Sequence, residues 1–133
     1  MSGNLILVAA GGGAGAVLRY LLSQALSRPG FGWPWATFTA NLAGGLLMGL
    51  LAGWLALRSG AEGERVRLLL GVGVLGGFTT FSAFSIETLM MIERRAWAQA
   101  GLYALLSVLL STAAVFLGLL VMRRWAAWGR SAP

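Results

Sequence analysis

Residues 76–85 read Gly-Gly-Phe-Thr-Thr-Phe-Ser-Ala-Phe-Ser and lie inside an uncharged stretch, residues 68–86, that has the length of a membrane span. In hydrocarbon, irregular backbone and unpaired hydroxyl groups cost several kcal/mol unless a partner satisfies them. We therefore expect this segment to line a path or to hold an ion. We also expect the helix that contains it to be broken between Gly76 and Thr80.

The composition of the whole chain is that of a membrane protein. Of its 133 residues, 58% are hydrophobic and 11% are charged, which is too apolar for a single water-soluble core of this size. Charge-free stretches recur along the chain, and about 20 helical residues suffice to cross a bilayer. We predict an all-α membrane protein, one domain over residues 1–133 with four transmembrane helices near 4–26, 36–57, 67–92 and 98–122.

The six tryptophans support this division. They all fall at the ends of predicted spans, where an amphipathic ring prefers the headgroup level. They are Trp33, Trp35, Trp54, Trp97, Trp125 and Trp128.

The charged residues are ten arginines and four glutamates, without His or Cys, and the net charge is +6. This set leaves out thiol, imidazole and most metal-ligand chemistry. Short loops and the C-terminal tail carry most of the arginines, so we expect them to attract membrane lipid headgroups and expect no nucleic-acid partner.

The arginines divide unevenly between the two sides of the predicted bundle. Six lie in the 58–67 loop and the C-terminal tail, against three or four on the other side. By the positive-inside rule this bias places both termini in the cytoplasm, but it is shallow enough to allow insertion in both orientations. The sequence has no internal repeat, so any symmetry must come from a second copy of the chain.

The second predicted span carries small and polar residues at every fourth position: Thr37, Asn41, Gly45, Gly49 and Gly53. The glycines permit close approach of another helix, and helix packing explains them without a ligand. The Asn41 amide must be hydrogen-bonded at this depth. Its role is open between lining a pore, in a stripe that begins with Thr37, and joining helices.

In the first span, Gly11, Gly15 and Arg19 share one helical face. The glycine run resembles a dinucleotide-binding pattern, but no acidic residue and no parallel-strand units follow it. Arg19 either reaches the membrane surface or points into an interior vestibule, where it suits an anion.

Polar residues recur on one face of the fourth span, where Tyr103, Ser107 and Ser111 are spaced by four. Such a track can replace the hydration shell of an ion, or it can serve polar packing.

In the third span, Phe81 and Phe84 share a face, for which core packing is the ordinary explanation. The positive edges of their rings can nevertheless attract a dehydrated anion.

The Gly-Gly-Phe-Thr-Thr run has two possible roles. A broken helix can turn freed carbonyl oxygens toward a cation, and the helix that restarts near Thr80 presents its amides to an anion. A simple glycine kink, healed by neighbouring groups, is the alternative.

The motif at 76–85, the Gly-Ala-x-x-Arg-Tyr at 15–20 and the Thr-x-x-x-Asn-x-x-Gly at 37–44 resemble those of the bacterial fluoride channel family, called Fluc or CrcB. The resemblance covers all the predicted spans in order. It implies an antiparallel, dual-topology homodimer with two fluoride pores and a structural sodium ion at its centre. Two positions depart from the family pattern, Ala83 and Ala36.

The resemblance also implies roles for individual residues. Fluoride would pass Asn41, Phe81, Phe84, Ser82, Tyr103, Ser107, Ser111 and Thr37. Arg19 and Glu87 would lie in the vestibule, and the backbone carbonyls of Gly76 and Thr79 would bind sodium.

These expectations describe a passive fluoride channel, multi-pass in the inner or plasma membrane, that exports fluoride and relieves its toxicity. We expect no enzymatic activity, because Glu87 is the only acid inside a span and has no evident catalytic partner. Two alternatives remain at this stage. One is a small coupled exporter that uses Glu87 as its coupling carboxylate, and the other is a non-conducting assembly subunit.

Overall fold

The computed structural model describes residues 2–26, 32–58 and 60–131. The helices are α1 Ser2–Leu26, α2 Trp35–Leu55, α3 Ala61–Val66, the π-helix η1 Arg67–Leu75, α4 Gly76–Phe78, α5 Phe81–Glu93 and α6 Trp97–Ser131. Four helical segments are long and apolar enough to cross a membrane, and the third of them, Ala61–Glu93, combines α3, η1, α4 and α5. The all-α class and the presence of four spans are confirmed.

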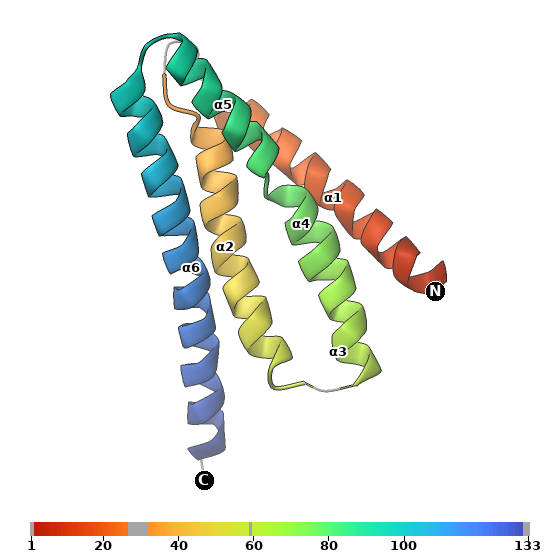
Figure 1. The fold of residues 1–133 in the computed structure, drawn as a ribbon. Coiled ribbons are helices and arrows are strands. Elements are labelled where there is room, and N and C mark those ends of the chain that lie inside the picture. Colours follow the sequence, from red (N-terminus) through yellow and green to blue (C-terminus); the bar gives the residue numbers. More distant parts are fainter. Residues whose placement is uncertain (1, 27–31, 59, 132–133) are drawn as a thin grey trace.

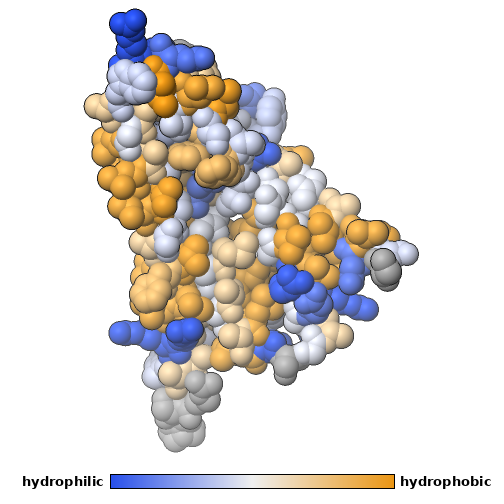
Figure 2. Space-filling model, in the orientation of Figure 1, coloured by the Kyte–Doolittle hydropathy of each residue, from blue (hydrophilic) through white to orange (hydrophobic). Residues whose placement is uncertain are grey.

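The helices form two closely packed pairs, α1 with the third segment and α2 with α6 (Figure 1). The N-terminus, the connection between α2 and α3, and the C-terminal end of α6 point toward the same end of the molecule. In Figure 2 hydrophobic residues cover most of the visible helix surfaces and hydrophilic ones gather toward the ends. This distribution is the one that a bilayer requires.

Glycines bring the backbones of each pair into direct contact. A Cβ atom on Gly49 would collide with the Val115 carbonyl of α6, and one on Gly15 would collide with the Val74 carbonyl of η1. Gly45 faces Ser111 in the same way, so the contacts advance along α2 and α6 in one direction. The glycine stripe of the second span therefore packs against the fourth span, as small residues do in membrane helix pairs.

The third segment departs from a regular helix in two places. Residues 67–75 form a π-helix, which the sequence analysis did not anticipate. The interruption falls within the predicted interval, but the double glycine does not cause it, because Gly76 keeps helical angles of φ −64° and ψ −37°. The backbone instead becomes extended at Thr79, with ψ 153°, and at Thr80, with φ −150° and ψ 121°.

The last helix is longer than the predicted span. We expected it to end near 122, and α6 continues to Ser131. Arg123 and Arg124 end the apolar stretch but do not disfavour helix. At about 1.5 Å per residue, the 35 residues of α6 exceed a hydrocarbon core of about 30 Å.

Candidate functional site

The break in the third segment is held open by Asn41 of α2. In a continuous α-helix the Thr80 N–H would donate to the Gly76 carbonyl. Here it donates to Asn41 Oδ1 at 2.9 Å, and Asn41 Nδ2 donates to the Thr80 carbonyl at 3.1 Å. Asn41 Oδ1 thus replaces the acceptor that the Thr80 N–H has lost, and the Gly76 carbonyl is left without its helical donor.

Thr80 also starts the helix that follows. Its Oγ1 accepts a hydrogen bond from the Ala83 N–H at 3.2 Å and lies 3.2 Å from Ser82 Oγ. A threonine in this position is a favourable N-cap. The remaining amides of the first turn of α5 carry partial positive charge, which favours an anion nearby.

Arg19 lies beside the same break. Its Nε donates to the Gly77 carbonyl at 3.2 Å, and the side chain is half-buried between α1 and the third segment. Gly11, Gly15 and Arg19 therefore all face the third segment, as their shared helical face predicted. The charge of Arg19 is directed toward the interruption of the helix.

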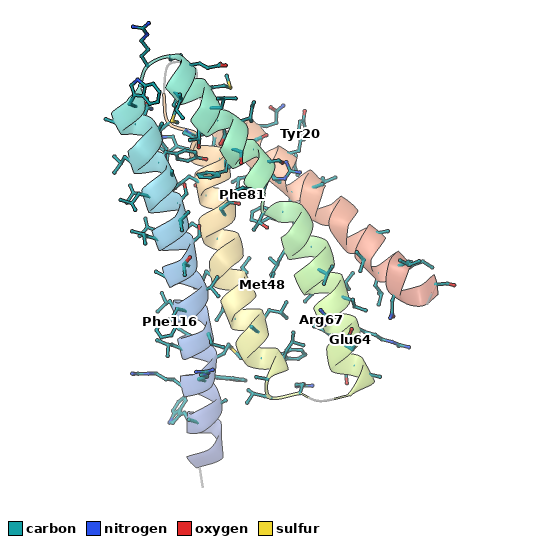
Figure 3. The ribbon with its side chains drawn as sticks, in the orientation of Figure 1. Tyr20, Met48, Glu64, Arg67, Phe81 and Phe116 are labelled. Carbon is teal, nitrogen blue, oxygen red and sulfur yellow. The ribbon has the colours of Figure 1, made fainter. Side chains whose placement is uncertain are left out.

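A groove of about 420 Å³ runs along the break and is bordered by α2, α5 and α6. Figure 3 shows two of its lining residues, Phe81 at the start of α5 and Met48 on α2. The Phe81 side chain is 76% exposed, so its ring faces the open side of the groove rather than a packed core. The polar lining residues are Asn41, Thr79, Thr80, Ser107, Ser111 and Thr112.

One hydroxyl on this groove is unsatisfied. The Ser107 oxygen is buried and forms no well-aligned hydrogen bond among the residues that the structure describes, with the Tyr103 hydroxyl as a neighbour. A buried donor without an acceptor costs about 1–3 kcal/mol. Ser107 therefore offers a donor to whatever enters the groove.

Aromatic rings continue from the groove into the protein. The Phe81 and Phe84 centroids are 5.3 Å apart, and the Phe84 and Tyr103 centroids are 5.2 Å apart. Tyr103 is fully buried and packs edge-on against Trp33 at 5.3 Å. The rings form one connected series from the open groove to the end of the bundle.

A carboxylate with two hydroxyl partners lies beside Tyr103. Thr37 Oγ1 donates to Glu87 Oε1 at 2.7 Å, and the Tyr103 hydroxyl donates to Glu87 Oε2 at 2.8 Å. Each oxygen of the Glu87 carboxyl group therefore accepts one hydroxyl hydrogen bond. The cluster joins α2, α5 and α6 through residues that are far apart in the sequence.

The predicted site residues therefore separate into groups. Asn41, Phe81, Phe84, Ser107 and Ser111 line the groove together with Thr79. Thr37, Tyr103 and Glu87 form their own cluster beyond it, and Ser82 is exposed beside the Thr80 cap.

Two lining features were missed by sequence reasoning. The Thr80 backbone is the direct partner of Asn41, and Gly44 gives Thr79 room, since a Cβ there would collide with Thr79 Cγ2. The doubled glycine at 44–45 in the second span was the available signal.

Side chains cannot supply a conventional metal centre in the described part of the chain, where no group of three or more His, Cys, Asp or Glu residues gathers. A cation here would need backbone oxygens. The Gly76 carbonyl, which has lost its helical donor, and the Thr79 carbonyl in the extended segment are of the oxygen type that a hard cation prefers.

Comparison with known proteins finds similarity over nearly the whole chain. Residues 6–119 match the family of CrcB-like proteins, described as Camphor Resistance (CrcB). The chain is 65% identical over 122 residues to the fluoride-specific ion channel FluC of Caulobacter sp. (strain K31), covering 91% of this chain and 95% of the relative. It is also 65% identical over 121 residues to the protein of that name from Phenylobacterium zucineum (strain HLK1), covering 90% and 95%. Against the protein of that name from Novosphingobium aromaticivorans, identity is 56% over 119 residues, covering 87% and 93%.

Proposed function

The chain belongs to the CrcB-like protein family, and from this membership and the geometry of the groove we infer that it is a fluoride-specific ion channel, multi-pass in the cell membrane. It is therefore a transporter and not an enzyme. The observation that carries the site assignment is the unsatisfied Ser107 hydroxyl in a groove that also holds the Asn41 amide and the exposed Phe81 ring.

We propose that fluoride crosses by exchanging its water for these groups. The ion is small and strongly hydrated, so a path needs several closely spaced donors to replace the lost hydration. Ser107, Ser111 and the Asn41 amide border the groove, and the Phe81 and Phe84 ring edges add weak attraction without a trapping charge. Ser82, next to the α5 cap, lies at its edge.

The second stage of the proposed path passes the Glu87 cluster. The Thr37 and Tyr103 hydroxyls already donate to the Glu87 carboxyl oxygens there, so they can turn the same donors to a passing fluoride. These two hydrogen bonds hold the Glu87 side chain in place, and we propose that it lies at the mouth of the path. Arg19, which donates to the Gly77 carbonyl on the α1 side of the break, would attract anions toward the third segment.

We further propose that two copies assemble antiparallel over this groove. A single chain in lipid would present the polar lining of the groove to hydrocarbon, which is costly. A second copy covers this face, and the shallow arginine asymmetry allows it to insert in the opposite orientation. A structural sodium ion on the shared axis would be held by the Gly76 and Thr79 carbonyls and would bring the two breaks together.

Efflux from liposomes tests the proposed function. Purified protein is reconstituted in vesicles loaded with potassium fluoride, and valinomycin is added to carry the balancing charge. A fluoride electrode then follows release with and without a pH gradient. We expect fast release that does not depend on the gradient. Release only with a gradient would indicate a coupled exporter, and no release would indicate a non-conducting subunit.

A further inference from the structure

A second cavity, of about 170 Å³, lies at the other end of α5 from the break. Its walls are residues 32–34, which precede α2, the α5 residues Glu87, Met90 and Met91, and Arg94, which directly follows α5. The apolar helices end here, since α5 stops at Glu93 and α6 begins at Trp97. The Trp97 side chain is 64% exposed, as expected for a ring at the membrane surface.

Direct contacts connect this cavity to the groove. Phe84 lines the groove, and its ring packs on Tyr103 at 5.2 Å. The Tyr103 hydroxyl donates to Glu87 Oε2 at 2.8 Å, and Glu87 lines the second cavity. These contacts join the lining of the groove to the lining of the second cavity.

The cavity wall carries a positive charge without an ionic partner. Arg94 is exposed, and its Nε donates to the Met90 carbonyl at 3.1 Å, which leaves the terminal amino groups available. Among the described residues Arg94 forms no ion pair, whereas Arg67 is paired with Glu64. The wall also holds a buried donor, the Trp33 indole N–H, that lacks an acceptor in the described part of the chain.

We propose that this cavity is one mouth of the fluoride path, a subsite for a small hydrated anion, and that Arg94 concentrates the anion there. The inference rests on the proposed function and adds a residue outside the groove to it. Arg94 directly follows α5 and lies seven residues after Glu87, about 10 Å along the helix. At that separation in water, a single charge changes the local concentration of an anion about twofold at low salt.

The neighbouring arginine provides a matched control. Arg95 is also exposed and carries the same charge, but it does not line the cavity. Fluoride efflux is measured for Arg94→Gln, Arg95→Gln and Arg94→Lys at low and at high ionic strength, with an impermeant salt on both sides of the vesicles. Each variant is first shown to give the same monodisperse size-exclusion peak as the unsubstituted protein.

At low ionic strength we expect Arg94→Gln to conduct about twofold more slowly, and Arg95→Gln and Arg94→Lys to conduct normally. At about 1 M salt, where the Debye length is about 3 Å, the difference should disappear. Equal slowing by both glutamine variants would assign the effect to general surface charge and overturn the subsite. Normal conduction by Arg94→Gln would also overturn it. Absence of efflux in the unsubstituted protein would instead overturn the proposed function, and the subsite with it.

Discussion

Replacing Asn41 by Leu tests the central contact of the site. The substitution removes two hydrogen bonds to the Thr80 backbone, of 3.1 and 2.9 Å, and leaves the Thr80 N–H without its partner. Each bond contributes about 0.5–1.5 kcal/mol, and water in the groove limits the added penalty. We expect the free energy of unfolding to fall by about 1–3 kcal/mol, with the protein still folded.

The effect of Asn41→Leu on conduction should be larger than its effect on folding. A hydrogen bond to a charged group is worth about 1.5–3 kcal/mol, which corresponds to about a ten- to hundredfold lower rate when that donor is lost from the path. Thermal unfolding in detergent measures stability, and fluoride release from liposomes measures conduction.

Thr80→Ala serves as the comparison. It removes the N-cap of α5, at a cost of about 1 kcal/mol, and leaves the Asn41 amide bonded to the Thr80 backbone. We expect it to conduct much better than Asn41→Leu at similar stability. Normal efflux by Asn41→Leu would remove Asn41 from the path. Loss of efflux that tracks loss of stability in both variants would reduce Asn41 to a structural role.

Three further predictions concern packing, the rings and the proposed sodium site. Gly49→Ala should lower the free energy of unfolding by about 1–3 kcal/mol, because its Cβ would meet the Val115 carbonyl carbon at 2.8 Å and the Leu119 nitrogen at 3.0 Å. In Gly101→Ala the new Cβ would have no atom of the described residues within 4 Å, so the free energy of unfolding should rise by about 0.5–1 kcal/mol. Equal effects in thermal unfolding would contradict the close packing of α2 and α6. Phe81→Ile should slow efflux while changing stability by less than about 0.5 kcal/mol, since the ring is 76% exposed. An unchanged rate would mean that the ring does not contact the ion. Gly76→Val should assemble poorly and not conduct. Among the described residues of one chain, a Cβ at this position meets the Gly71 carbonyl at 3.7 Å, so a single chain has room for it. Thr79→Ser, which keeps the backbone carbonyl, should conduct. Size-exclusion chromatography in sodium and in a bulky organic cation measures dimer assembly. A dimer that forms equally well in both would contradict the sodium site.

Features that depend on local sequence could be predicted well. Charge-free stretches and tryptophan positions indicated the four spans, and the Gly-Gly-Phe-Thr-Thr run indicated a break in the third. The cause of that break could not be predicted, because it depends on a side chain of another helix. Asn41, which the sequence left open between joining helices and lining a pore, does join helices and also lines the groove.

Other features follow from tertiary packing and left little trace in the sequence. The Thr37–Glu87 and Tyr103–Glu87 bonds join residues 50 and 16 positions apart. The π-helix over 67–75 has the same apolar character as an α-helix, and the pattern of residues alone does not separate the two. Its close contact with Gly11 and Gly15 on α1 is visible only in the folded chain.

Anion selectivity tests the central claim most directly. Vesicles that hold one reconstituted preparation are loaded with equal concentrations of fluoride and chloride, and release of both ions is followed with ion-selective electrodes. The closely spaced donors of the groove predict rapid release of fluoride, with chloride retained at the level of protein-free vesicles. Release of both ions at similar rates, or of neither, would contradict the fluoride path through Asn41, Phe81 and Ser107.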